Sequence, residues 1–311
     1  MIMLAKGRLR AGVMLAGFAA LAGCGGSGGS LVVRSVPYEK PVTQTDYVGK
    51  TFPVFFLVGE AGDPSGDAVA GRGTITYNTN DTVTMQLPGR APVIFTPTGS
   101  TALGTTYQAS SGNASTIDAV VTGLASTDAL RLVTSVGDQR SFLGGFGFET
   151  LAADRESLPT ATYNTAGAVF LTATNAEDFL PVAGDGTLVA NFGSGMISGT
   201  FLSTDPVEVQ LAGSAGTPDE LALRFMLQNG QITPSGFSGG VTATGELVVD
   251  GSGPPLALDA AIANGSAEGA FFGEEAAAVS GIFEGDLALS EGGTSLADFE
   301  AAGFVSGAKQ P

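Results

Sequence analysis

The segment from Gly265 to Gly285 constrains the fold most, because two short apolar runs containing phenylalanine flank a small acidic turn. In the second run Phe283, Leu287 and Leu289 alternate with smaller or acidic residues, which places them on one face of a strand. The segment therefore predicts an antiparallel hairpin. A closed barrel crowds its inner wall, so glycine or alanine must share that wall with phenylalanine. The spacing alone leaves a hairpin of a β-sandwich equally open.

The N-terminus carries an export signal. Lys6, Arg8 and Arg10 precede an apolar run over residues 11–20 that is too short for a permanent transmembrane helix, and Leu21-Ala-Gly-Cys24 follows. This pattern resembles the bacterial lipoprotein signal, in which residues 1–23 are removed and the cysteine is acylated. We therefore expect Cys24, the only cysteine, to be the lipidation site. An ordinary cleavage site with an incidental cysteine is the alternative.

A flexible tether follows the predicted anchor. Residues 25–30 contain only glycine and serine, so they cannot pack and are expected to be disordered. We assign residues 24–50 to the lipid anchor and the tether. Gly25 stands where aspartate would resemble the inner-membrane retention signal, so the resemblance implies export to the outer membrane. A periplasmic and a surface-facing position both stay open.

The composition favours β-structure throughout. The chain has 47 glycines in 311 residues, is rich in Thr, Ser, Ala and Val, and has few long helix-forming runs. Its apolar fraction of 43% is enough to bury a core. Strand-like runs recur from Thr51 onward, and about eight of them follow Pro159. A single cysteine allows no disulfide, so packing and sheet hydrogen bonds must hold the fold.

The final hairpin resembles the closing hairpin of the transferrin-binding-protein-like surface lipoproteins. The positions that match the family are Gly269, Phe271, Phe272, Gly273, Ala276, Val279, Gly281 and Phe283. Glu274, Ala278 and Ser280 depart from its pattern. A second element, residues 185–192 followed by 195–201, resembles the family's strand that ends in Ala-Asn-Phe and turns into an apolar-Ser-Gly strand.

The resemblance implies an all-β protein with two domains. We expect a strand-rich, handle-like domain over residues 51–159 and an eight-stranded antiparallel β-barrel over residues 160–290. Residues 291–311 are then expected to form a C-terminal tail. The family's function implies a monomer that captures an extracellular protein, haem, an iron carrier or a small solute, and that meets the membrane only through its lipid.

The charge is strongly negative and unevenly distributed. Removing the three signal-peptide cations changes the formal charge from −17 to −20. From residue 160 onward Arg224 and Lys309 face 18 acidic residues. Such a field repels nucleic acid and anionic lipid, which excludes nucleic acid as a partner. A solvated acidic surface is the ordinary explanation, and a basic partner is the alternative.

The residues for common enzyme chemistry are missing. The sequence has no histidine, which removes Ser-His-Asp and Cys-His catalysis, and its one cysteine is assigned to lipid. Ser238 lies in a Gly-x-Ser-x-Gly pattern without a base, so a glycine-rich turn is the simpler interpretation. Carboxylate pairs are treated as solvated turns: Glu274 with Glu275, Asp219 with Glu220, Asp63 with Asp67, and Glu177 with Asp178. We predict no enzyme activity, no metal and no cofactor.

Two functions remain open. The first is an outer-membrane lipoprotein that binds a ligand through its barrel loops, and the alternative is an architectural envelope lipoprotein without a soluble ligand. Haem would have to use tyrosine or methionine in place of histidine, with Tyr77, Tyr107 and Tyr163 as the candidates, although core or surface tyrosine is the simpler role. Exposed apolar clusters at residues 179–181 or 271–272 would favour the binding protein.

Overall fold

The structure is a computed structural model of the chain. It describes residues 35–39, 43–60, 68–101, 104–110, 116–124, 127–136, 140–173, 179–209, 219–248 and 256–311. The predicted signal peptide, Cys24 and the glycine-serine tether lie outside these residues. Among the described residues, no helix is long and apolar enough to cross a bilayer.

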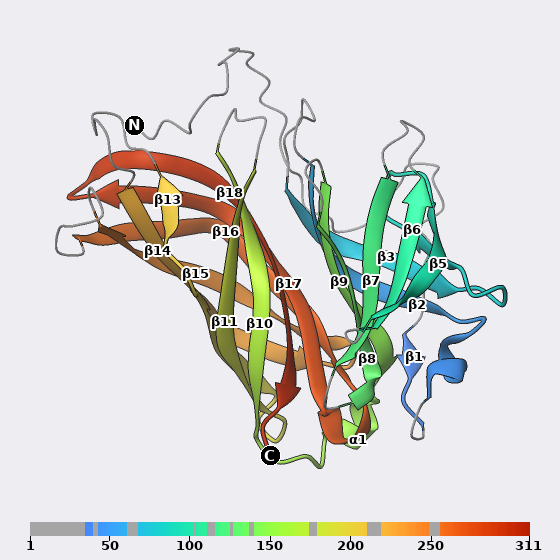
Figure 1. The fold of residues 1–311 in the computed structure, drawn as a ribbon. Coiled ribbons are helices and arrows are strands. Elements are labelled where there is room, and N and C mark those ends of the chain that lie inside the picture. The colour runs from blue at the N-terminus through green and yellow to red at the C-terminus, as the bar shows by residue number, and fades with distance from the viewer. Residues whose placement is uncertain are drawn as a thin grey trace.

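The C-terminal half forms a closed antiparallel barrel (Figure 1). Its strands are β10 (Ala161–Ala173), β11 (Phe179–Asn191), β12 (Met196–Ser203), β13 (Val207–Val209), β14 (Asp219–Thr233), β15 (Gly236–Val248), β16 (Leu256–Phe272), β17 (Ala278–Glu291) and β18 (Thr294–Lys309). The short β13 and β12 both pair with β14, so the described strands occupy eight positions in the wall. β18 pairs with β10 from Tyr163↔Lys309 to Ala173↔Phe299 and closes the ring. The predicted eight-stranded barrel is confirmed.

The closing strand corrects the prediction for the C-terminus. The sequence predicts a tail over residues 291–311, but Thr294–Lys309 is a full barrel strand. A two-residue turn at Gly292 and Gly293, both with positive φ, leads into it. Residues 301–304 are buried on both faces, inside the barrel and against the first half of the chain, so they lack the polar alternation that marks a half-exposed strand.

β16 is one long strand that includes the first arm of the predicted hairpin. A β-bulge interrupts its pairing with β17, where the register shifts between Ala263 and Ser266 and Asn264 adopts φ 55°. Beyond the bulge the predicted faces of the hairpin are confirmed, because Phe283 belongs to the barrel core and Ile282 to an outward-facing cluster.

The N-terminal half is strand-rich, as predicted, and its pairings also close on themselves. The strands are β2 (Thr51–Glu60), β3 (Val69–Tyr77), β4 (Val83–Gln86), β5 (Val93–Thr101), β6 (Gly104–Ser110), β7 (Thr116–Leu124), β8 (Thr127–Val136) and β9 (Arg140–Glu149). Each pairs antiparallel with the next, and β9 returns to β2. We call this unit the first ring.

Each ring has its own core. In the first ring, η1 (Gln44–Tyr47) inserts Tyr47 between β2 and β9, where its ring centroid lies 5.0 Å from Phe52 and 4.9 Å from Phe148. The barrel interior holds two apolar layers, one centred on Phe225 and Phe283 and the other on Phe237 and Phe271. Packing inside both rings therefore replaces the disulfides that the sequence cannot supply.

An apolar seam joins the rings. Phe55, Leu57 and Leu130 of the first ring pack in one cluster with outward-facing barrel side chains, among them Phe272 and Phe304. A backbone hydrogen bond also crosses the seam, because the Gly273 amide donates to the Phe148 carbonyl over 3.0 Å. The connecting helix α1 (Ala152–Arg155) lies at the end of the barrel where the C-terminus also lies. We call the barrel end with α1, the β11–β12 turn and the C-terminus the lower end.

Candidate binding surfaces

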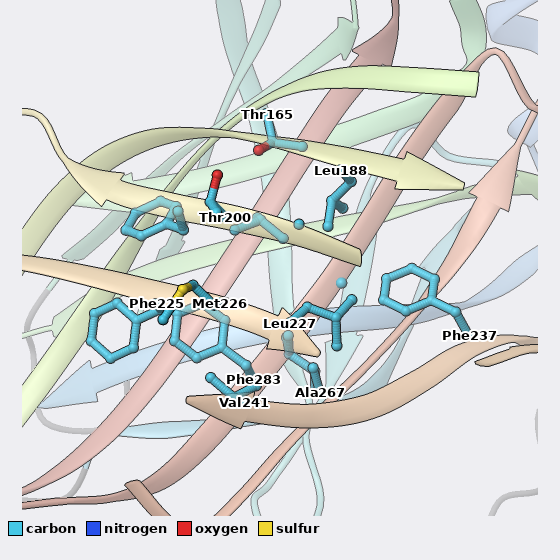
Figure 2. A pocket seen from close by; sticks show the side chains of 15 residues that line it. Thr165, Leu188, Thr200, Phe225, Met226, Leu227, Phe237, Val241, Ala267 and Phe283 are labelled. Atoms are coloured by element: carbon cyan, nitrogen blue, oxygen red, sulfur yellow. The ribbon is translucent and has the colours of Figure 1, made fainter. Parts of the chain in front are cut away.

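The barrel interior is nearly filled. The cavity in Figure 2 has a volume of about 40 Å³ and is lined mainly by side chains of the two core layers, including Leu188, Phe225, Leu227, Phe237 and Phe283. Ligand pockets for drug-sized molecules enclose roughly 300–1,000 Å³. Within the described residues, this cavity is therefore too small for such a ligand.

Phenylalanine rings lying over glycines explain how the lumen is filled. A Cβ at Gly303 would come within 2.2 Å of the Phe283 ring, and one at Gly269 within 2.3 Å of the Phe237 ring. Each glycine thus leaves the space that a ring from a neighbouring strand occupies. This arrangement is the one that the glycine and phenylalanine of the final hairpin predict.

Of the two apolar clusters whose exposure would favour a binding protein, the one at residues 271–272 is buried. Phe271 and Phe272 are each 1% exposed. The Phe271 ring lies 5.1 Å from Phe192 within the barrel, and Phe272 lies in the seam. The Phe179 ring centroid lies 4.5 Å from that of Phe170 at the edge of the seam, where the first ring of strands covers this face of the barrel. The exposed cluster that would favour a binding protein is therefore not found at residues 271–272, and at residues 179–181 Phe179 and Leu180 are half-buried.

The exposed large apolar side chains of the described barrel lie on β11 and β12. Val189, Met196 and Leu202 are 37–41% exposed. Val189 pairs with Ser198 and Met196 with Asn191, so these two apolar residues are diagonal neighbours. Leu202 pairs with Asp185, farther along the same two strands. Single exposed residues of this kind are normal on a protein surface and do not mark a contact site.

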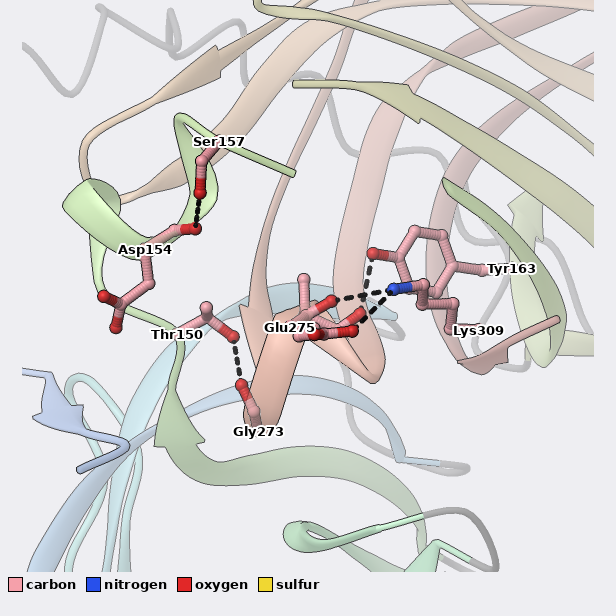
Figure 3. A network of polar contacts seen from close by, with 8 residues as sticks. Thr150, Asp154, Ser157, Tyr163, Gly273, Glu275 and Lys309 are labelled. Atoms are coloured by element: carbon pink, nitrogen blue, oxygen red, sulfur yellow. Dashed lines mark hydrogen bonds and ion pairs between the residues drawn. The ribbon is translucent and has the colours of Figure 1, made fainter. Parts of the chain in front are cut away.

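A polar network rigidifies the lower end (Figure 3). The turn η3 (Glu274–Ala276) contains two non-glycine residues with positive φ, Glu275 at 51° and Ala276 at 56°. The Tyr163 hydroxyl donates to the Ala276 carbonyl over 2.8 Å, and Lys309 Nζ donates to the Glu275 carbonyl over 3.2 Å. Thr150 Oγ1 donates to the Gly273 carbonyl over 2.7 Å. These bonds hold a backbone conformation that is unfavourable for residues with a Cβ.

A hollow of about 230 Å³ lies beside this network. Its lining combines carboxylates with a few neutral groups: Tyr38, Glu39, Thr150, Asp154, Leu158, Gly273, Glu274 and Glu275. Burial and then the Glu274 carboxylate raise the pKa of the Tyr38 hydroxyl. No group of three or more potential metal ligands among His, Cys, Asp and Glu occurs in the described residues. The hollow is an acidic surface feature at the junction of the rings.

Two residues that the sequence did not single out, Arg155 and Glu149, lie at this junction. Arg155 is 4% exposed, and its Nη2 donates to the carbonyls of Pro234 and Thr233 over 2.7 and 3.1 Å. It therefore holds the β14–β15 turn of the barrel against α1. Burial raises the pKa of the Glu149 carboxyl to about 7, although Arg72 and Arg155 oppose the shift. The only sequence signal was a charged stretch between two apolar strands.

The structure does not assemble the candidate catalytic residues. Ser238 is exposed within β15, in the middle of a sheet, so both the strand-to-helix elbow and the predicted turn are absent there. Asp219 and Glu220 are successive residues of β14 and point to opposite faces. Glu274 and Glu275 border the hollow. Asp63, Asp67, Glu177 and Asp178 lie outside the described residues.

The tyrosine candidates for haem are dispersed. Tyr77 and Tyr107 lie in the first-ring core and Tyr163 in the barrel, each at most 5% exposed. Burial raises the pKa of all three hydroxyls, which disfavours the phenolate that an iron ligand requires. Arg131 packs inside the first ring, with its guanidinium carbon 4.4 Å from the Tyr47 ring centroid. Core tyrosine is the role that this structure supports.

Comparison with known proteins gave structural matches alone. No family model matches the sequence, and no curated protein matches it. A mutant of transferrin binding protein B from Haemophilus parasuis Hp5 aligns over 83% of this chain and 45% of its own, with a TM-score of 0.42 and 13% identity. The isotype 1 transferrin binding protein B from serogroup B Neisseria meningitidis aligns over 83% of this chain and 43% of its own, with a TM-score of 0.41 and 12% identity.

Intact Ap-TbpB, with its N and C lobes, aligns over 83% of this chain and 46% of its own, with a TM-score of 0.44 and 11% identity. This chain is similar in structure to transferrin binding protein B. It spans less than half the length of each of these three proteins.

Proposed function

We propose that this protein is a non-catalytic binding lipoprotein, anchored in the outer membrane through acylated Cys24. It captures its ligand on the outside of the barrel. The observation that carries the proposal is the pairing of a lipobox with a closed barrel whose interior is filled. A barrel that encloses about 40 Å³ leaves its outer surface for recognition, so a protein, or an iron or haem carrier protein, fits better than a small solute.

The absence of a plausible reaction centre supports a binding role. The sequence contains no histidine, and the described carboxylate pairs and Ser238 are not arranged with a base or a metal-ligand set. The glycine-serine composition of residues 25–30, which lie outside the described residues, also suits a tether that would present the rings away from the proposed lipid. We propose that the protein acts as a monomer at the cell outer membrane.

The function is tested by affinity capture. The mature chain from Cys24 onward has one thiol, so coupling through that thiol immobilises it in the geometry of its proposed anchor. We expect the resin to retain a protein, alone or carrying haem or iron, from the natural surroundings of the bacterium. An excess of the same chain in solution should compete for it. Recovery of neither protein, haem nor metal would contradict capture.

The anchor is tested separately. We expect Cys24→Ser to abolish incorporation of a fatty-acid label and to move the protein from the membrane fraction to the soluble fraction. Acylation of one residue by several chains gives stable attachment, at ~0.8 kcal/mol per buried methylene. Unchanged membrane association and retained label in this variant would overturn the assignment of Cys24.

The second candidate is an architectural envelope lipoprotein. The burial of Phe271 and Phe272 favours it, because exposure of these residues would have favoured the binding protein. In that case the acidic exterior serves solubility alone. The capture experiment separates the two functions, since an architectural protein retains no specific ligand under the same conditions.

A further inference from the structure

The start of the described chain is fastened to the junction of the two rings. β1 (Val36–Pro37) pairs in parallel with the end of β9, with Val36 opposite Phe148 and Pro37 opposite Glu149. The Tyr38 amide donates to the Glu149 carbonyl over 2.7 Å. We call residues 35–39 the strap.

Side chains reinforce this attachment. Val36 and Tyr38 pack, partly buried, against the core of the first ring. Ser35 forms a hydrogen bond with the carboxyl group of Glu149. The strap therefore leaves the fold at a defined place, although it contributes only a short strand to the sheet.

That place is the lower end of the barrel. Glu149, the partner of the strap, pairs with Phe272 at the end of β16. The C-terminus reaches the same end, where the Gln310 amide donates to the Thr162 carbonyl over 2.7 Å. The β17–β18 turn at Gly292 and Gly293 marks the opposite, upper end, because these two strands run the length of the barrel.

The expected tether is short compared with the height of the barrel, so it can orient an anchored molecule. Ten residues lie between Cys24 and Ser35, so eleven peptide units join them; a flexible coil of that length, which the glycine-serine composition predicts, would have a root-mean-square length of roughly 18 Å and a maximum near ~40 Å. The thirteen residues of β10, tilted as barrel strands are, span roughly 30 Å along the barrel axis. The upper end therefore lies farther from the tether's exit than the tether's average length.

We propose that the strap orients the anchored protein, so that its lower end faces the bilayer and its upper end faces the solution. This inference rests on the proposed anchor at Cys24. It assigns ligand capture to the upper end, which includes Asp205, Glu220 and Glu291.

Energy transfer from tryptophan to labelled lipid tests this orientation. The sequence has no tryptophan, so each introduced one is the sole donor. Ser194→Trp places it in the exposed β11–β12 turn at the lower end, and Glu291→Trp places it at the exposed end of β17. The mature chain is coupled through its only thiol to maleimide-headgroup lipid in phosphatidylcholine vesicles that contain dansyl-headgroup lipid.

We expect transfer from the lower-end tryptophan to exceed transfer from the upper-end tryptophan several-fold. Equal transfer from both positions, or stronger transfer from the Glu291→Trp variant, would overturn the proposed orientation. Chemical coupling replaces acylation, so this outcome does not depend on whether cells lipidate Cys24. Loss of the anchor in cells and loss of orientation on vesicles are therefore separate results.

A strap variant tests the cause. Val36→Ala combined with Tyr38→Ala removes the side-chain packing and frees the chain as far as Tyr47, which is buried in the first ring. The flexible segment then doubles to about 23 residues, with a root-mean-square length of roughly 26 Å. We expect the difference between the two tryptophan positions to shrink, while circular dichroism shows both rings folded. An undiminished difference in the folded variant would show that the strap does not set the orientation.

Discussion

At the residue scale, Glu149 makes stability depend on pH. Burial raises the pKa of its carboxyl from 4.5 to about 7, so the folded state keeps a proton that the unfolded state loses between those values. Stability from this group is therefore highest below pH 4.5 and falls as the pH rises to 7. We expect Glu149→Gln to stabilise the protein at pH 8 by up to about 3 kcal/mol and to have little effect near pH 4.5.

Urea unfolding of both proteins at pH 5 and pH 8 measures this effect. The difference in the free energy of unfolding between the two pH values should be smaller in the Glu149→Gln variant. The same difference in both proteins would contradict the assignment of the titration to Glu149.

Tyr163 supports the strained turn η3. Its hydroxyl donates to the Ala276 carbonyl over 2.8 Å in a buried position, so Tyr163→Phe leaves that carbonyl without this donor. We expect a loss of about 1–3 kcal/mol in the free energy of unfolding, measured by urea titration. Tyr38→Phe, at a half-buried tyrosine of the same end, serves as the control and should change stability by less than ~0.5 kcal/mol. Equal effects of the two changes would refute a special role for Tyr163.

At the element scale, the ring-over-glycine contacts set the spacing of the barrel strands. A Cβ at Gly303 of β18 would come within 2.2 Å of the Phe283 ring of β17. We expect Gly303→Ala to cost about 1–3 kcal/mol in thermal or urea unfolding, because a packed core resists added volume. At Gly240 of β15 the nearest atom to an added Cβ is 3.9 Å away, so Gly240→Ala is the matched control.

A second substitution distinguishes overpacking from loss of backbone freedom. Phe283→Ala removes the ring that a Cβ at position 303 would meet. The cost of Gly303→Ala should therefore be smaller in the Phe283→Ala background than in the wild-type background. An equal cost in both backgrounds would mean that the ring is not the obstacle.

The same elements show what the sequence could predict. Phe283, Leu287 and Leu289 alternate cleanly with smaller or acidic residues, so this alternation alone assigns them to a common face. β18 could not be recognised, because residues 301–304 are buried on both faces and carry no polar alternation. The burial of Phe272 depends on the docking of a second ring, which no local pattern encodes. Arg155 was missed for the same reason, since its carbonyl partners lie 78–81 residues away.

At the scale of the whole molecule, the seam couples the two rings. Phe55 and Leu57 from the first ring and Phe272 and Phe304 from the barrel are each at most 3% exposed because they cover one another. Separating the rings would expose this surface, so we expect calorimetry to show a single unfolding transition. Phe272→Ala should lower its midpoint by several degrees without splitting it, at a cost of about 3–5 kcal/mol. Two well-separated transitions in the wild-type protein would contradict the coupling.

The filled interiors direct recognition to the exterior. With a lumen cavity of about 40 Å³, the proposed ligand capture is assigned to outward-facing residues. In the proposed orientation, the strap at Glu149 sets which of these residues face away from the lipid. The proposed binding, anchoring and orientation can each be tested separately.

Photo-cross-linking in living cells tests the central claim most directly, namely that a Cys24-anchored protein captures a partner at its upper end. A photoreactive amino acid replaces Glu291 at the upper end or Ser194 at the lower end. We predict a discrete cross-linked protein from position 291, none from position 194, and a loss of the cross-link from the membrane fraction when Cys24 is changed to serine. A partner captured from position 194 alone, or from neither position, would contradict the account.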